Sequence, residues 1–354
     1  MSYLSSNSES QQIQSLPESF YRYKSVIDDA ITKTLRHDNY SANQMLEYAM
    51  GWSDIHGNPE STSKGKALRP TLCLLASQAT GEPIIQALPA AISLELIHNS
   101  SIIHDDIQDL DETRRHRPTL WKVWGKSKSL VVGDILKIIA DITLWNLPNN
   151  TQTFVQVQHA IKLITQAYLE MVEGQFLDIS FEGRLDINLE EYLRMIGKKT
   201  SALIRCSLHV GALLGTNDQK IVQSFRKYGE SLGLLFQIRD DILGVSGDTK
   251  FTGKPVGADI RRKKNTLPVI FAMEQVKGKD IQTLRNIYRN PDVTENEVHT
   301  ALDIIEKVGA IKYANDLAQK HEKIAITTIK ELKISPEVHG ELRNIANFLM
   351  TREH

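Results

Sequence analysis

The sequence of 354 residues lacks several features that mark particular classes of protein. It has only two cysteines, Cys73 and Cys206, and both lie in apolar helical contexts, so we expect reduced core residues rather than a disulfide framework. No apolar run reaches the length of about 20 residues that spans a bilayer. Residues 1–16 are polar and rich in Ser and Gln, which predicts a disordered tail and not a signal peptide. The net charge of −1 favours neither nucleic acid nor an anionic membrane as a partner. These features predict a cytoplasmic protein without a membrane span.

Alternating apolar and polar residues, the pattern of strands, are also scarce, whereas helical periodicity continues from residue 17 to the end. Helices are expected at 18–36, 41–51, 66–80, 84–109, 127–145, 152–180, 188–214, 218–243, 265–277, 279–289, 295–307, 309–331 and 336–351. Clusters of Gly, Pro and Asn separate them, and Thr294 with Glu297 fits a capping box. Because no linker divides the chain, the prediction is an all-α single domain over residues 17–354, built as a bundle of roughly a dozen helices.

The stretch from His98 to Arg115 carries three carboxylates within five residues, Asp105, Asp106 and Asp109. On a helix, Asp105 and Asp109 share one face, and like charges about 4 Å apart repel by about 4 kcal/mol at an effective dielectric near 20. A hard divalent cation with oxygen ligands would relieve this repulsion. A solvated helix end whose acids pair with the following arginines explains the same pattern.

A second acidic pair, Asp240 and Asp241, ends another apolar helix. The glycine-rich, cationic segment 244–263 follows it and suits either phosphate binding or a solvated connection. Two such pairs predict a cavity between antiparallel helices, with carboxylates on opposite walls and metal ions that bind a di- or triphosphate ester.

Several further motifs surround the two acidic pairs. In chain order the set is Gly65-Lys66-x-x-Arg69-Pro70, His98, Asp105-Asp106-x-x-Asp109 with Arg114-Arg115, Gly174-Gln175 with Asp178, Lys199-Thr200, Phe236-Gln237-x-x-Asp240-Asp241, and Gly253-Lys254 with Asp259, Lys264 and Thr266-Leu267-Pro268. From about residue 20 onwards, the chain thereby resembles trans-isoprenyl diphosphate synthases of the farnesyl/geranylgeranyl diphosphate synthase type.

The resemblance implies the isoprenoid synthase fold with a deep central cavity, and Mg²⁺-dependent head-to-tail condensation of isopentenyl diphosphate with an allylic diphosphate. The implied isopentenyl diphosphate ligands are Lys66, Arg69, His98 and Arg115. The implied Mg²⁺ ligands, for three ions per site, are Asp105, Asp109 and Asp240, with Asp106 and Asp241 in support. The allylic diphosphate would also contact Arg114, Lys199 and Lys254, with Lys264 nearby, while Thr200 and Gln237 would lie along the developing carbocation. The resemblance also implies a homodimer.

Two positions depart from the family pattern. Gly244 stands where many relatives have a third aspartate, for which Asp248 is a candidate substitute, and His116 stands where glycine is common. Closure of segment 244–263 over the cavity is expected to exclude water.

Product length should depend on Ser100 and Ser101, five and four residues before Asp105. In the family, bulky aromatic residues at these places stop growth at C15. Two serines leave the pocket open as far as Leu94 and Ile97, so a C20 product, geranylgeranyl diphosphate, is predicted. A C15 or a C25 or longer product stays open, because a side chain of another helix could close the pocket.

Two other functions fit the sequence less well. A terpene cyclase normally carries an Asn/Asp-Asp, Ser/Thr, Glu series on a late helix, and here Asn315-Asp316 lacks the hydroxyl while Lys323 stands in place of the glutamate. A non-catalytic subunit of a heteromeric synthase usually loses the aspartates, and this chain keeps both pairs.

Overall fold

Helices account for nearly all of the regular structure in the computed structural model, which describes residues 16–36, 40–60, 65–148, 154–247 and 255–352. The N-terminal half contains α1 (Glu18–Arg36), α2 (Asn43–Ala49), α3 (Leu68–Ala79), η1 (Ile84–Gln86), α4 (Leu88–Gln108), β1 (Thr113–Arg114), β2 (Arg117–Pro118), α5 (Leu120–Trp124), α6 (Lys126–Leu144) and α7 (Phe154–Phe181). The C-terminal half contains α8 (Leu189–Ile196), η2 (Gly197–Ser201), α9 (Ala202–Gly215), α10 (Gln219–Ser246), α12 (Ala258–Arg261), α13 (Leu267–Gln275), α14 (Gly278–Arg289), α15 (Glu295–Lys307), α16 (Ala310–Lys330) and α17 (Pro336–Thr351).

The predicted all-α class is confirmed, and each expected helical segment corresponds to helix in the structure. The capping box is also confirmed, since the Thr294 hydroxyl accepts from the Glu297 N–H at 3.4 Å and the Glu297 carboxylate accepts from the Thr294 N–H at 2.8 Å. Three short elements were not predicted: α5, α12 and the two-stranded hairpin β1–β2. The predicted tail up to residue 15, Asp248 and Lys254 lie outside the described residues.

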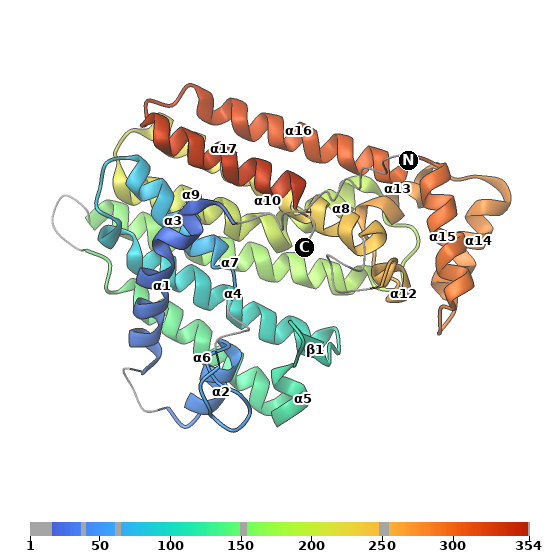
Figure 1. Ribbon diagram of the computed structural model, residues 1–354, viewed down its shortest axis with the longest axis horizontal. Helices are drawn as coiled ribbons and strands as arrows, with labels where there is room; N and C mark the ends of the chain where they lie inside the picture. The colour runs from blue at the N-terminus through green and yellow to red at the C-terminus, as the bar shows by residue number, and fades with distance from the viewer. Residues whose placement is uncertain (1–15, 37–39, 61–64, 149–153, 248–254, 353–354) are drawn as a thin grey trace, which may run out of the picture.

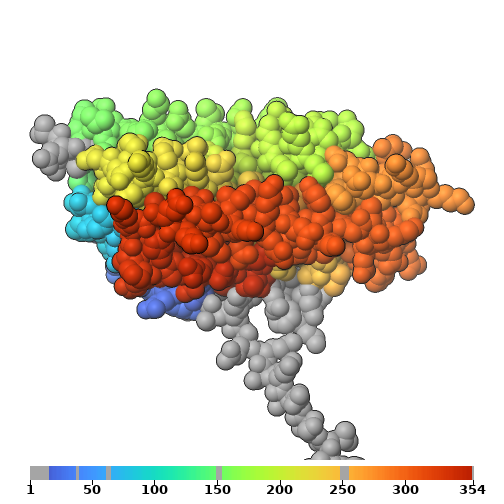
Figure 2. Space-filling model, turned by 90° about the horizontal axis from the view of Figure 1, so that it is seen from above, coloured from blue at the N-terminus to red at the C-terminus, as the bar shows by residue number. Residues whose placement is uncertain are grey.

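The long helices pack side by side around one main core (Figure 1). Helix α4 packs extensively against α6, while α10 lies between α9 and α16. Seen from above, α16 and α17 form a red band across the molecule, and the green α7 lies towards the upper edge (Figure 2). A second, smaller core joins α13, α14 and α15 at one end of the molecule (Figure 1). This arrangement places the C-terminal ends of α4 and α10 in the same region as α12.

Cys73 and Cys206 are buried and free, as predicted. Their helices approach closely because Gly211 of α9 faces α3, where an added Cβ would lie only 2.1 Å from the Cys73 carbonyl oxygen. Within the described ranges, no helix is long and apolar enough to cross a membrane.

Candidate active site

Most of the predicted site residues meet at one cavity of about 760 Å³ between α4, the hairpin, η2, α10 and α12. The predicted residues that line it are Asp105, Arg114, Arg115, Lys199, Thr200, Gln237, Asp240, Asp241 and Lys264. Tyr192, Asp259 and Arg262 line it as well. The structure therefore brings together the two acidic pairs, which are separated by more than a hundred residues in the sequence.

The first acidic wall is the C-terminal end of α4, and cations already neutralise it. The Lys199 ammonium lies 3.2 Å from Asp105 and 2.5 Å from Asp178. Arg114 Nε donates to Asp106 at 2.6 Å, and its guanidinium lies 3.6 Å from Asp105. Burial opposes ionisation of Asp105, but Lys199 and Arg114 outweigh it and lower the pKa of Asp105. For Asp106 burial prevails over Arg114, so the pKa of Asp106 is raised. The pKa values of these two neighbouring carboxyl groups are therefore shifted in opposite directions.

The two adjacent carboxylates of the second acidic wall, Asp240 and Asp241, differ in their exposure to solvent. The Asp240 side chain is 61% exposed and lies 3.3 Å from the Arg352 guanidinium, whereas Asp241 is only 3% exposed. Asp241 accepts hydrogen bonds from the Tyr192 hydroxyl, from Gln237 Nε2 at 2.9 Å and from the Leu267 N–H at 2.9 Å. Burial raises the pKa of Asp241 to about 7, and these donors oppose that rise. Asp240 is thus accessible from solvent, whereas the Asp241 carboxylate is enclosed by protein groups.

Position 244, where the sequence lacks a third aspartate, is filled by another carboxylate. A Cβ added to Gly244 would lie 1.8 Å from Asp259 Oδ2, a distance at which no side chain fits. Asp259 comes from α12, and both residues line the cavity. The carboxylate that the second motif lacks is therefore adjacent in space, on a different helix.

A π-helical turn, η2, carries Lys199 and Thr200 into the cavity. Such turns are rare and frequently occur at functional sites. This turn lies directly against α7, because a Cβ added to Gly174 would be 2.1 Å from the Lys199 backbone nitrogen. The Thr200 hydroxyl donates to Gln237 Oε1 at 2.7 Å. The predicted Gly174, Lys199, Thr200 and Gln237 are thus in direct contact or hydrogen-bonded as one unit.

The hairpin that follows α4 presents Arg114 and Arg115. Thr113 pairs with Pro118 and Arg114 with Arg117, so Arg115 and His116 form a two-residue turn with φ of 50° and 62°. Asn-Gly is the usual sequence of a turn with two positive φ angles. Other residues in this conformation cost about 1–2 kcal/mol each. Arg115 and His116 are therefore held in a strained backbone conformation.

Behind the hairpin lies the cationic group predicted to bind the second diphosphate. The Arg115 guanidinium contacts the backbone at Gly65, where an added Cβ would lie 3.2 Å from its nitrogens. Burial, together with Arg352 and Arg115, lowers the pKa of Lys66. Burial also lowers the pKa of Arg69 to about 10, although Glu95 opposes this change. Burial and three arginines hold the pKa of His98 well below its usual range, so its imidazole is neutral. Lys66, Arg69 and His98 are not on the lining of the 760 Å³ cavity itself.

Two ion pairs cross the mouth of the cavity from the segment after α12. Lys264 lies 3.2 Å from Asp109, and Arg262 pairs with Asp111. Asp109 and Lys264 also line an adjoining pocket of about 450 Å³. In the described part of the expected closing segment 244–263, Arg262 therefore already contacts the end of the first acidic stretch.

The two serines predicted to set product length face different surroundings. Ser100 is 1% exposed, and its hydroxyl donates to the Gly133 carbonyl of α6 at 2.8 Å. The Ser101 hydroxyl donates to the His98 carbonyl within α4 at 2.8 Å. Ser101 is one helical turn from Asp105 and shares its face. Of the two, Ser101 is the residue on the face of the acidic wall.

Sequence patterns missed Tyr192 and Arg352. Arg352 stacks 4.1 Å over the Phe236 ring, and its guanidinium also donates to the Phe236 carbonyl at 3.1 Å. It lies beyond α17 and reaches α10 only through the fold, so its position in the chain gives no signal. The Tyr192–Asp241 contact likewise joins α8 to α10.

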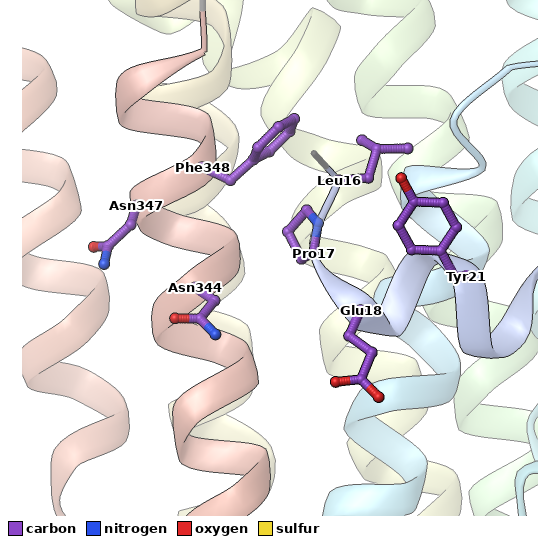
Figure 3. A pocket seen from close by; sticks show the side chains of 7 residues that line it. All are labelled: Leu16, Pro17, Glu18, Tyr21, Asn344, Asn347 and Phe348. Carbon is purple, nitrogen blue, oxygen red and sulfur yellow. The ribbon is translucent and has the colours of Figure 1, made fainter. Parts of the chain in front are cut away.

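A separate groove of about 550 Å³ lies between the start of α1 and α17 (Figure 3). It is lined by Leu16, Pro17, Glu18, Tyr21, Asn344, Asn347 and Phe348. This lining has no cationic side chain, so the groove lacks the groups that bind a diphosphate.

The acidic walls suit Mg²⁺ better than a metal held by protein alone. No group of three or more His, Cys, Asp or Glu side chains in the described residues could hold a metal ion by itself. Mg²⁺ usually keeps several waters and binds through one or two carboxylates plus substrate phosphates. Asp105 on α4 and the exposed Asp240 on α10 are oxygen donors of that kind, and both line one cavity. The donor set therefore fits Mg²⁺ that arrives with a phosphate ester.

Comparisons with known proteins agree with this geometry. The polyprenyl synthetase family model matches residues 59–305. The chain is 35% identical to "(2E,6E)-farnesyl diphosphate synthase" of Mycobacterium tuberculosis over 92% of this chain and 91% of that protein. It is also 35% identical to "Geranylgeranyl diphosphate synthase" of the same organism over 83% of each. The crystal structure of a polyprenyl synthetase from Streptomyces coelicolor A3(2) superposes with a TM-score of 0.87 at 33% identity, covering 94% of this chain and 98% of that one.

Proposed function

This chain belongs to the polyprenyl synthetase family and is a prenyl diphosphate synthase, and from that premise we propose that its main product is C20 geranylgeranyl diphosphate. The reaction condenses isopentenyl diphosphate with C5, C10 and C15 allylic diphosphates. The observation that carries the proposal is the cavity that Asp105, Lys199 and Arg114 line together with Asp240. Relatives with similar identity carry C15 and C20 names, so the chain length rests on the residues of the pocket.

We propose that the allylic diphosphate binds between the two acidic walls. Asp105, Asp109 and Asp240 would hold Mg²⁺, three ions per site, with Asp106 in support. Asp241 is left out of this set because its two oxygens already accept hydrogen bonds from Tyr192, Gln237 and Leu267. When bound, the ions supply Lewis-acid neutralisation of the leaving diphosphate. Lys199 and Arg114, which already pair with the first wall, would turn to the diphosphate oxygens, with Lys254 and Lys264 completing the set. The cations of this chain thereby favour departure of the diphosphate.

The acceptor, isopentenyl diphosphate, would bind to Lys66, Arg69, His98 and Arg115. Support comes from burial, which lowers the pKa values of Lys66, Arg69 and Arg115. Neighbouring arginines add to this effect at Lys66 and at Arg115. Clustered, partly desolvated cations are stabilised when an anion binds. Neutral His98 can then donate one hydrogen bond without adding a further positive charge.

The C20 proposal rests on the small side chain of Ser101. A tail that runs along α4 from Asp105 towards its N-terminus passes Ser101 first, and a serine there leaves room for growth. Ser100 is packed against α6 and contributes less to the wall of the pocket. Leu94 and Ile97, both fully buried on α4, are the next large side chains of that helix.

We also propose a homodimer formed through α6 and α7. The two helices contact each other where the Lys137 ammonium lies 4.5 Å from the Tyr168 ring. Their outer surfaces carry large apolar side chains that are 40–69% exposed: Leu130, Val131, Ile138, Ile142, Leu169, Val172, Phe176 and Ile179. Contiguous exposed apolar surface of this kind marks interaction sites. Sedimentation or light scattering should give twice the 39.9 kDa chain mass, and Phe176→Asp should shift the protein towards the monomer.

The proposed reaction is tested with Mg²⁺, isopentenyl diphosphate and each of the C5, C10 and C15 allylic diphosphates in turn. Chromatography of the hydrolysed products should show C20 alcohol as the main product from all three. Removal of Mg²⁺ by EDTA should abolish turnover, and excess Mg²⁺ should restore it. A main C15 or C25 product would refute the chain length alone, whereas no elongation with any primer would refute the proposed reaction.

A further inference from the structure

Asp241, at the second acidic wall, has its two oxygens occupied by protein donors. Oδ2 accepts from the Tyr192 hydroxyl and from the Leu267 N–H at 2.9 Å. Oδ1 accepts from Gln237 Nε2 at 2.9 Å. The neighbouring Asp240 side chain is exposed to solvent, and the contact described above for it is the ion pair with the Arg352 guanidinium. The two adjacent carboxylates therefore have different surroundings, and a shared role as metal ligands does not account for the embedded one.

We propose that Asp241 is a positioning residue that fixes the orientation of the Gln237 amide and, through it, the direction of the Thr200 hydroxyl. This inference rests on the proposed prenyl transfer at the same site. A backbone N–H can only donate, so Leu267 requires Asp241 Oδ2 to be an acceptor. With Tyr192 donating to the same oxygen, Oδ1 is left to accept from the Gln237 amide.

The amide orientation decides the charge that Thr200 presents to the cavity. Because Gln237 Nε2 donates to Asp241, its Oε1 faces Thr200 and accepts the hydroxyl proton at 2.7 Å. The proton of Thr200 is thereby directed away from the cavity, which both residues line. The oxygen lone pairs of Thr200 remain for the ligand, and their partial negative charge favours an allylic cation. With the amide reversed, Nε2 would donate to Thr200 and leave its proton free to face the cation.

Tyr192 and Leu267 are part of this arrangement because both donate hydrogen bonds to Asp241 Oδ2 and so fix the carboxylate. Tyr192 is 1% exposed on α8, and Leu267 is the first residue of α13. Three helices thus converge on the carboxylate of α10. An arrangement built in advance, which needs no reorganisation as charge develops, is the form that electrostatic catalysis takes.

The test compares binding of two analogues by calorimetry in the presence of Mg²⁺. One is an ammonium analogue of the allylic diphosphate, with a positive nitrogen in place of the ionising carbon, and the other is an uncharged thiolodiphosphate. Asp241→Asn can donate to Gln237 and so reverses the amide. We expect it to weaken binding of the ammonium analogue about 10-fold to 100-fold, the loss typical of one hydrogen bond to a charged group, and to change binding of the thiolodiphosphate less than about twofold.

Asp240→Asn is the matched control, because it alters the neighbouring carboxylate that is proposed to hold metal. It should weaken both analogues and raise the Mg²⁺ concentration needed for half-maximal binding, which Asp241→Asn should leave unchanged. Gln237→Met and Thr200→Val should reproduce the selective loss. Since all three residues act through one hydroxyl, the double variant of Asp241→Asn with Thr200→Val should lose no more than either single variant.

Equal weakening of both analogues by Asp241→Asn, a raised Mg²⁺ requirement, or additive losses in the double variant would overturn the inference. If Asp241→Asn does not fold, the test uses Gln237→Met, alone and combined with Thr200→Val. The inference then requires selective weakening of the ammonium analogue and no additional loss in the double variant. Wild-type protein that binds neither analogue would instead refute the proposed reaction, so the two failures are distinguishable.

Discussion

Replacing Gly174 by alanine should displace the turn η2, which carries Lys199 and Thr200, while leaving both side chains in the protein. The new Cβ would lie 2.1 Å from the Lys199 backbone nitrogen and 2.5 Å from its Cα, whereas ordinary contact begins near 3.4 Å. Neither α7 nor η2 can yield through a side chain, because the clash is with backbone. The turn that carries Lys199 and Thr200 must therefore retreat by more than 1 Å.

The expected cost has two parts. Overpacking of a helix contact costs about 1–3 kcal/mol, and the better helix propensity of alanine offsets up to about 1 kcal/mol of it. A displacement of about 1 Å at reacting groups can lower the rate about 100-fold. Gly174→Ala should thus lower the midpoint of thermal unfolding by a few degrees and lower kcat about 100-fold, without removing any functional group.

Gly197→Ala provides the matched control within η2 itself. Gly197 has a helical φ of −57°, and an added Cβ would meet nothing within 4 Å. Alanine should therefore stabilise the protein by up to about 1 kcal/mol and leave kcat within about twofold. Steady-state kinetics and thermal unfolding of both variants decide the matter. Normal activity in Gly174→Ala, or equal losses in both variants, would show that close packing against α7 does not position the turn.

Three further predictions concern single positions. Ser101→Phe should shorten the main product, measured by chromatography, and an unchanged product would contradict the proposed route of the tail. Ser100→Phe should chiefly destabilise the protein, because Ser100 is packed against Gly133. His116→Gly should relieve a φ of 62° and raise the free energy of unfolding by about 1 kcal/mol, measured by denaturant titration; a loss of stability would show that the turn is not strained. Gly244→Ala should lower activity and destabilise the protein, because the new Cβ would lie 1.8 Å from the Asp259 carboxylate. Adding Asp259→Ala to the same chain should recover the stability. An unchanged melting temperature in Gly244→Ala would refute the contact.

The helices could be predicted because each long one has an apolar face that repeats with the helical period. Elements too short to repeat were missed, namely α5 and α12. The hairpin was missed for a different reason. Its turn is Arg115-His116, which carries none of the glycine or asparagine signal that usually predicts positive φ.

At the site, spacing along the chain indicated the residues of both acidic walls but not how each is used. Asp240 and Asp241 are about 100° apart on their helix, and nothing local distinguishes the exposed one from the embedded one. The difference comes from Tyr192 and Leu267, which approach from α8 and α13. In the same way, Asp259 reaches the space beside Gly244 only because α12 folds back over α10.

The hairpin also has a mechanical consequence for the two sides of the cavity. Arg114 faces Asp105 and Asp106, while Arg115, the next residue, lies against Gly65. Their Cα atoms are about 3.8 Å apart across one peptide bond. Helices can slide and tilt relative to one another, but a covalent bond of this kind cannot lengthen. The turn therefore fixes the separation of the two backbone positions from which the guanidinium groups extend, so that a movement of the hairpin displaces the anchor points of both cations together.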